Sequence, residues 1–162
     1  MKLALAQLNP IIGDLDGNAE KIFEVCKEIK NEEVGLVITP ELSLIGYPPK
    51  DLLFNPRLYD EEKDVLNILS ERLNNQCRNL SVLIGIAEPT PDIEVPKLYN
   101  SVVILEQGTW RIVARKQLLP TYDVFDEKRY FRSAKNSSIL NFNYQEKLWK
   151  IGITICEDIW VE

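Results

Sequence analysis

The chain has 162 residues, 45% of them hydrophobic, a formal net charge of -6 and no histidine. This length and apolar content allow one globular domain with a hydrophobic core. The 19 basic residues form no basic tail or stripe, which argues against a nucleic-acid surface. The lack of histidine excludes catalysis by Ser-His-Asp or Cys-His groups, and most zinc and haem sites.

The sequence shows no sign of export or membrane insertion. No apolar run approaches the length of a membrane span, and the N-terminal segment reaches the polar Gln7 too early for a signal peptide. Three cysteines, an odd number at wide spacing, suit reduced thiols and do not form a disulfide framework or a zinc motif. We therefore expect a cytoplasmic protein without a metal site.

The first part of the chain alternates between strand and helix patterns. Residues 2–8 predict a first strand, and residues 34–39 a second strand that is almost entirely apolar, as expected for a central strand. Between them, apolar residues recur at spacings of three and four after Asn18, which we expect to cap an amphipathic helix. A second helical pattern covers residues 59–79.

Two of the cysteines lie on the apolar stripes of these helices. Cys26 belongs to the first stripe and Cys77 to the second. A free cysteine in such a position usually serves as a small core residue. We expect both thiols to be buried and without a chemical role.

The later part of the chain predicts strands joined by hairpins. Residues 82–87 form one strand, 99–105 and 110–116 a hairpin, and 138–142 and 148–155 a second hairpin. Residues 117–131 are aromatic and charged without periodicity, which is typical of a functional loop. The order β-α-β-α-β-β-β-β-β predicts an α/β fold with a mixed sheet.

Three chemically active side chains stand where predicted strands end. Glu41 follows the second strand, Lys116 ends the strand 110–116, and Cys156 follows the β-branched run 151–155, which predicts a buried strand. Our hypothesis is that these three ends converge. They would then supply a carboxylate base, a fixed positive charge and a thiol nucleophile.

This set can carry out hydrolysis without histidine. A desolvated glutamate can take the proton of a thiol and later protonate a leaving amine. A lysine ammonium, together with the backbone N–H after the cysteine, can stabilise the oxyanion of a tetrahedral intermediate. The reaction implied is attack on an unreactive C–N bond, such as that of a carboxamide, through a thioester.

Longer motifs surround these residues and carry a family resemblance. Residues 40–49 (PELSLIGYPP), Lys116 with Leu119 and Pro120, and residues 155–160 (ICEDIW) together resemble the nitrilase, or carbon-nitrogen hydrolase, superfamily. Within it, residues 46–53, 124–131 and 156–160 are most similar to the glutaminase domains of glutamine-dependent NAD synthetases. The resemblance extends along the whole chain.

The resemblance implies a nitrilase-type α-β-β-α sandwich and a role for each site residue. Glu41 would be the general base, Lys116 the oxyanion-stabilising cation and Cys156 the nucleophile. Glu127 would support the lysine and the substrate, and Tyr122 and Glu157 would help to hold glutamine. The function implied is hydrolysis of the glutamine amide, which releases ammonia for NAD synthesis from deamido-NAD.

The same resemblance sets the expected cofactors and partners. The amide hydrolysis needs no cofactor, whereas ATP and Mg²⁺ would belong to an ATP-dependent NAD synthetase domain, present in cis or in trans. We expect a homo-oligomer when the protein is complete. We expect no nucleic-acid or membrane partner.

The chain departs from the family in where it stops, because only six residues follow Cys156. We therefore expect residues 1–162 to form a single, incomplete domain, truncated after the cysteine strand. Such a domain should have an unpaired sheet edge and exposed apolar surface, and it should fold poorly or need a partner.

Three alternatives remain open at this point. The chain could hydrolyse another amide or a nitrile, as other branches of the family do. It could be a non-catalytic remnant that only binds or assembles. It could also be a flavodoxin-like ligand module, which would have parallel strand order without the two late hairpins.

Overall fold

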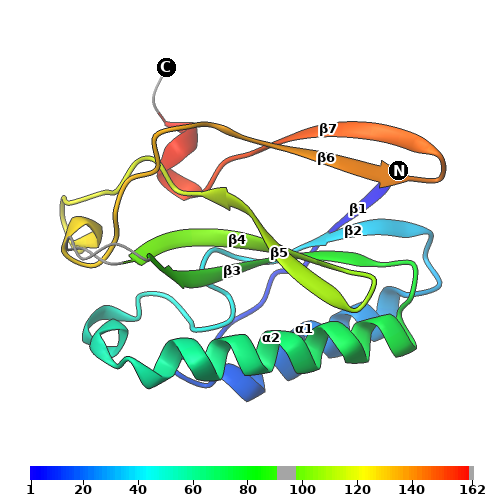
Figure 1. The fold of residues 1–162 in the computed structure, drawn as a ribbon, viewed down its shortest axis with the longest axis horizontal. Coiled ribbons are helices and arrows are strands. Elements are labelled where there is room, and N and C mark those ends of the chain that lie inside the picture. Colours follow the sequence, from blue (N-terminus) through cyan, green and yellow to red (C-terminus); the bar gives the residue numbers. More distant parts are fainter. Residues whose placement is uncertain (91–97, 161–162) are drawn as a thin grey trace.

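The computed structural model describes residues 1–90 and 98–160, and its elements form three layers (Figure 1). A five-stranded sheet has the order β1-β2-β3-β4-β5. Helices α1 (Leu15–Ile29) and α2 (Arg57–Gln76) cover one face of this sheet, and the hairpin β6-β7 covers the other. The sheet comprises β1 (Lys2–Leu5), β2 (Val34–Ile38), β3 (Ser81–Pro89), β4 (Leu98–Glu106) and β5 (Thr109–Arg115), and the hairpin comprises β6 (Ser138–Tyr144) and β7 (Lys147–Ile153).

The pairing of the strands confirms the predicted mixed sheet and α/β class. Strands β1, β2 and β3 are parallel, whereas β3-β4, β4-β5 and β6-β7 are antiparallel. This arrangement is incompatible with a flavodoxin-like module. The described residues supply one helical layer and both sheet layers of the expected sandwich, and they form no α-helix on the outer face of the hairpin.

Both hairpins close through two-residue turns. Gln107 and Gly108 have φ angles of 52° and 78°, and Gln145 and Glu146 have φ angles of 50° and 62°. Positive φ at both central residues matches the right-handed twist of the flanking strands, so the turns fix the register of each pair. The two predicted hairpins are confirmed.

The first helix begins earlier than the sequence pattern indicated. Asp14 is the N-cap of α1, and its side chain accepts a hydrogen bond from Gly17 N. Asn18 is buried inside the helix, where its amide bonds to the backbone of Ile11 and Leu44. The prediction of an Asn18 cap was therefore wrong, because this amide fastens two loops to the helix.

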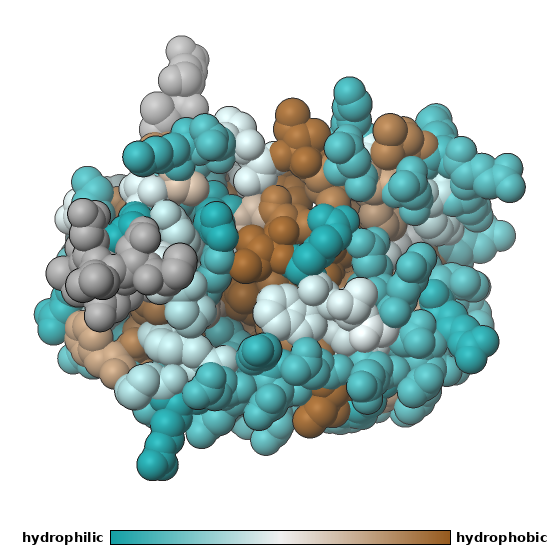
Figure 2. Space-filling view, in the orientation of Figure 1, coloured by the Kyte–Doolittle hydropathy of each residue, from teal (hydrophilic) through white to brown (hydrophobic). Residues whose placement is uncertain are grey.

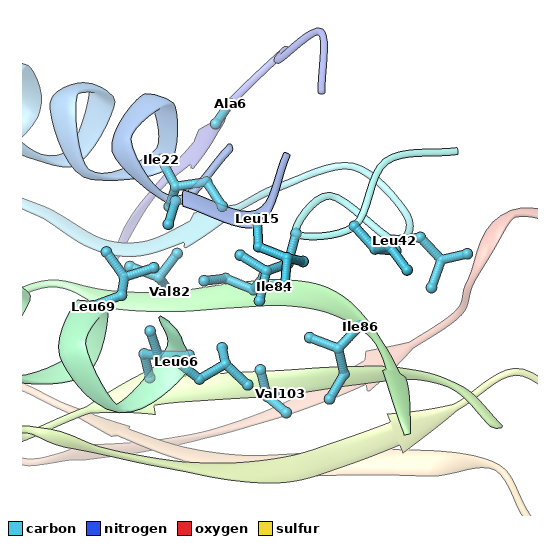
Figure 3. Packing of buried hydrophobic residues seen from close by; sticks show 14 of the residues in the cluster. Ala6, Leu15, Ile22, Leu42, Leu66, Leu69, Val82, Ile84, Ile86 and Val103 are labelled. Atoms are coloured by element: carbon cyan, nitrogen blue, oxygen red, sulfur yellow. The ribbon is translucent and has the colours of Figure 1, made fainter. Parts of the chain in front are cut away.

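Two hydrophobic clusters hold the layers together. The larger one lies between the helices and the sheet, where Leu66 and Leu69 of α2 approach Val82 and Ile84 of β3 (Figure 3). The smaller one lies between the sheet and the hairpin and contains Leu36, Leu83, Ile104, Leu140 and Phe142. Each such side chain contributes about 1.5–3 kcal/mol when fully buried. Cys26 and Cys77 are buried, as predicted.

Apolar surface is exposed on the sheet side of the molecule. Figure 2 shows a hydrophobic band between the hairpin and the sheet, above the mainly hydrophilic helical layer. At the edge strand β1, Leu3 and Leu5 are 51% and 72% exposed, and on the hairpin Ile139 and Leu148 are 65% and 53% exposed. Within the described part of the chain, neither helix is long and apolar enough to cross a membrane.

Candidate active site

Lys116 lies at the centre of a buried cluster of charged side chains. It directly follows β5, and its ammonium donates to Glu41 Oε1 at 2.7 Å and to Glu127 Oε2 at 2.8 Å. The Lys116 side chain is fully buried, whereas those of Glu41 and Glu127 are 16% and 5% exposed. Glu41 lies beyond the end of β2, and Glu127 begins a short 3₁₀ helix. The fold thus brings these three predicted residues together.

The cluster keeps its cation charged. Burial lowers the pKa of Lys116, but attraction by Glu41 and hydrogen bonds to Glu127 and Glu41 outweigh it, so the pKa is raised. For Glu127, burial raises the pKa, and the hydrogen bond from Lys116 opposes this effect only in part. The site therefore holds a buried ammonium beside two carboxyl groups at neutral pH.

Asn100 of β4 fixes the orientation of Glu41. Its amide nitrogen donates to Glu41 Oε1 at 2.6 Å, so this oxygen receives hydrogen bonds from both Asn100 and Lys116. Asn100 is only 1% exposed. Sequence reasoning missed this residue, although an asparagine within an otherwise apolar strand is a signal that could have pointed to it.

Cys156 stands on a strained turn beyond the hairpin. It is the first residue of a short 3₁₀ helix, Cys156–Ile159, and its φ angle of 47° lies in the left-handed region. For a residue with a Cβ, this conformation costs of order 1–2 kcal/mol. Cys156 is solvent-exposed, unlike the other two cysteines.

The prediction of a buried strand leading into Cys156 was wrong. β7 ends at Ile153, and exposed residues alternate with partly buried ones along it. The reason is that only one face of the hairpin packs against the sheet, through Trp149, Ile151 and Ile153. The apolar run therefore reflects one packed face and a loop rather than a strand covered on both sides.

The surroundings of Cys156 raise the pKa of its thiol above the ordinary value of cysteine. Burial raises its pKa, Glu41 and Glu127 raise it further by repulsion, and Lys116 opposes them. The Glu41 carboxyl group therefore lies close enough to the thiol to influence its pKa. Glu41 is thus placed to receive the thiol proton, while Lys116 supplies a positive charge in the same cluster.

Aromatic residues form the rim of this cluster. The hydroxyl of Tyr47 donates to Glu127 Oε1 at 2.9 Å, and that of Tyr122 donates to Glu157 Oε2 at 2.9 Å. The ring of Phe125 lies 5.6 Å from the Tyr122 ring and 6.5 Å from the Tyr47 ring. All six predicted site residues therefore belong to one region, and Tyr47 is an addition that sequence reasoning did not single out.

A cavity of about 340 Å³ adjoins the cluster and is lined in part by Tyr47, Phe125 and Glu127. A larger hollow of about 700 Å³ lies beside β5 and residues 132–138, and it contains none of the six predicted residues. Of the six predicted residues, Glu127 lines the smaller cavity, which therefore borders one side of the charged cluster.

The carbon-nitrogen hydrolase family model matches residues 2–162 of this sequence. The chain belongs to the carbon-nitrogen hydrolase family. It is 45% identical over 161 residues to the glutamine-dependent NAD(+) synthetase of Synechocystis sp., a match that covers 98% of this chain and 28% of the relative. The corresponding synthetase of Aquifex aeolicus is 36% identical over 160 residues, covering 99% of this chain and 26% of the relative.

Solved structures agree with this assignment. The glutamine-dependent NAD+ synthetase of Acinetobacter baumannii superposes with a TM-score of 0.82 at 37% identity, covering 99% of this chain and 29% of that one. An amidase of Nesterenkonia sp. shares the fold, with a TM-score of 0.75 at 18% identity over 98% of this chain and 56% of that one. This carbon-nitrogen hydrolase chain thus spans little more than a quarter of the length of its synthetase relatives.

Proposed function

We propose that this carbon-nitrogen hydrolase domain is a glutaminase that hydrolyses the carboxamide of glutamine through a thioester on Cys156. The observation that carries the proposal is the buried ammonium of Lys116, which lies 2.7 Å from Glu41 and 2.8 Å from Glu127, in a cluster whose charges also act on the Cys156 thiol. The choice of glutamine over other amides is supported by the names of the relatives, which are glutamine-dependent NAD(+) synthetases.

In the first half of the reaction, Cys156 Sγ attacks the carboxamide carbon while Glu41 takes the thiol proton. The Lys116 ammonium stabilises the negative charge that develops on the carbonyl oxygen. The C–N bond then breaks, Glu41 passes its proton to the leaving nitrogen, and ammonia departs. A γ-glutamyl thioester remains on Cys156.

In the second half, water attacks the thioester carbon and Glu41 takes one of its protons. The C–S bond breaks, the sulfur regains a proton from Glu41, and glutamate leaves. Glu127 is not itself a proton carrier in this scheme; its carboxyl group accepts a hydrogen bond from the Lys116 ammonium at 2.8 Å and is oriented by the Tyr47 hydroxyl at 2.9 Å. Lys116 therefore acts as a fixed charge throughout.

Glutamine is distinguished from simpler amides by its α-ammonium and α-carboxylate groups. We assign the α-ammonium to the carboxylate of Glu157, which the Tyr122 hydroxyl already orients at 2.9 Å. Glu157 directly follows Cys156, so the pair sets the distance between the α-ammonium and the reacting amide. A substrate without the α-ammonium loses this contact.

The ammonia would serve an ATP-dependent NAD synthetase domain that acts on deamido-NAD, in cis or in trans, within a homo-oligomer. The synthetase names of the relatives support this partner. ATP and Mg²⁺ belong to that domain's reaction, and the amide hydrolysis is assigned to side chains of this chain alone.

Ammonia release from glutamine, measured beside a panel of aliphatic amides of similar length, tests the proposal. We expect glutamine to be preferred, with the preference reduced in Glu157→Gln. Equal rates with glutamine and the simple amides would instead indicate another amidase branch. If wild-type protein releases no ammonia from any amide, and if Cys156→Ala binds glutamine as well as wild type does, the chain would be a binding module.

A further inference from the structure

A side chain outside the proposed machinery connects its two halves. The carboxylate of Asp158 accepts hydrogen bonds from Gln117 N at 3.0 Å and Leu118 N at 2.8 Å through Oδ1. Through Oδ2 it accepts a hydrogen bond from Ile155 N at 3.1 Å. One carboxylate thus spans the residues directly after Lys116 and the residue directly before Cys156.

The same residue also closes the turn that presents the nucleophile. Asp158 N donates to Ile155 O at 3.2 Å, so Asp158 and Ile155 are joined in both directions across Cys156. Cys156 has a φ angle of 47°, a conformation that persists only where its surroundings hold it. Hydrogen bonds from a backbone N–H group to a carboxylate are stronger than those between two neutral groups. They are therefore suited to holding the Cys156 turn in this conformation.

We propose that Asp158 is a positioning residue of the candidate active site. It holds Cys156 in the position, relative to Lys116 and Glu41, that the reaction requires. It contacts neither the reacting atoms nor the three proposed reacting side chains, and it acts through the backbone on either side of two of them. The inference rests on the proposed function only where glutamine turnover is the readout, because the reactivity of the thiol can be measured without glutamine.

Asp158→Asn is the sharpest test because it keeps the size of the side chain. An amide offers one acceptor oxygen, so it can serve Gln117 and Leu118 or Ile155 but cannot bridge them. We expect kcat for glutamine to fall about 10-fold or more, with KM changed by less than about 3-fold, because geometry and not binding is lost. Asp14→Asn is the matched control, since the Asp14 carboxyl group also accepts a hydrogen bond from a backbone N–H group, but that of Gly17 and not one next to Lys116 or Cys156.

The pH dependence of Cys156 alkylation by iodoacetamide supplies the second readout. The groups that face the thiol are Glu41, Lys116 and Glu127, with the hydroxyls of Tyr47 and Tyr122 nearby. Burial and Glu41 raise the thiol pKa, so a thiol released from the cluster should titrate at lower pH, nearer to the ordinary value of cysteine. Asp158→Asn should therefore make Cys156 more acidic and yet less active in turnover.

A purely structural role predicts a different pattern. Loss of turnover in parallel with a lower melting temperature, at an unchanged alkylation midpoint, would overturn the proposal, as would wild-type turnover in Asp158→Asn. If Asp158→Asn does not fold, Asp158→Glu is the second variant, because it keeps two acceptor oxygens. We expect it to show an intermediate kcat and a shifted midpoint in the pH dependence of Cys156 alkylation. A wild-type kcat and midpoint in Asp158→Glu would overturn the proposal. Absence of glutaminase activity in the wild type would remove the proposed function and leave the alkylation test intact.

Discussion

The ammonium of Lys116 lies 2.7 Å from Oε1 of Glu41, although 75 positions separate the two residues in the sequence. Lys116 directly follows β5, whereas Glu41 lies in the turn that follows β2 in the same sheet. Asn100 of β4 donates to the same Glu41 oxygen, so the sheet supports the contact from both partners. The contact also gives Lys116 a structural role beside its proposed catalytic one.

Replacing Lys116 by methionine should therefore cost stability as well as activity. Glu41 and Glu127 would be left buried without their cation, and we expect a loss of about 3–5 kcal/mol in the free energy of unfolding. Adding Glu127→Gln should recover part of that stability without restoring ammonia release. Urea unfolding measures the change in the free energy of unfolding. Lys27→Met is the control, because the Lys27–Glu24 ion pair is about half exposed and contributes less than about 1 kcal/mol. Equal costs for both lysine variants would contradict the prediction.

A buried carboxyl group on α2 should make stability depend on pH. Glu62 is 3% exposed, and burial raises its pKa to about 8, against a partial opposing effect of its hydrogen bond from Ala87 N. The folded state then binds this proton more tightly than the unfolded state. The contribution of protonated Glu62 to the free energy of unfolding is fully present below the ordinary glutamate pKa, and it is lost as pH rises through about 8.

Glu62→Gln should remove most of this dependence. We expect the variant to be more stable than wild type at pH 9 by on the order of 3 kcal/mol, with a much smaller difference at pH 5. Urea unfolding at both pH values measures the effect. The exposed neighbour Glu61 provides the control, and an identical pH response of Glu61→Gln and Glu62→Gln would argue against burial as the cause.

The three thiols should differ in reactivity in the folded protein. Cys26 is fully buried, with its pKa raised to about 12 by burial, and Cys77 is 3% exposed with its pKa also raised by burial. Cys156 is exposed. Intact-mass analysis after brief alkylation should show one label per native chain, and three after denaturation. Rapid labelling of Cys26 in the native protein would mean that α1 does not pack as described.

The exposed apolar residues of β1 and the hairpin should promote association of the 162-residue chain. We expect Leu5→Lys together with Ile139→Thr to reduce it, because their side chains are 72% and 65% exposed and can be replaced without loss of core packing. Light scattering coupled to size-exclusion chromatography provides the measurement. Wild-type chain that is monomeric and melts cooperatively would refute both this prediction and the expected need for a partner.

Local sequence patterns were sufficient for the element order and both hairpins. Helical spacing placed Cys26 and Cys77 in the core, and the turns at Gln107 and Gln145 lie between strands of the expected type. The cap of α1 was misplaced because Asn18 makes contacts outside its own helix, with Leu44 among them. Such a contact has no local signature.

The candidate site was found only in part for the same reason. Glu41, Lys116 and Cys156 could be proposed because a carboxylate, an ammonium and a thiol near predicted strand ends form a chemically complete set, and because the motifs around them resemble the carbon-nitrogen hydrolase family. Asn100 and Asp158 act through contacts that span 59 and 41 positions, and neither brings a reactive group to the site. Their importance emerges only when the backbone brings them to Glu41 and to the residues flanking Cys156.

The most direct test of the account is covalent labelling with an electrophilic glutamine analogue, followed by intact-mass analysis and peptide mapping. We predict a single adduct at Cys156 that glutamine suppresses by competition, that forms more slowly in Glu41→Gln and that is absent in Cys156→Ala. Labelling that is equal in Cys156→Ala, or that excess glutamine leaves unchanged, would contradict the assignment of Cys156 as the nucleophile of a glutaminase.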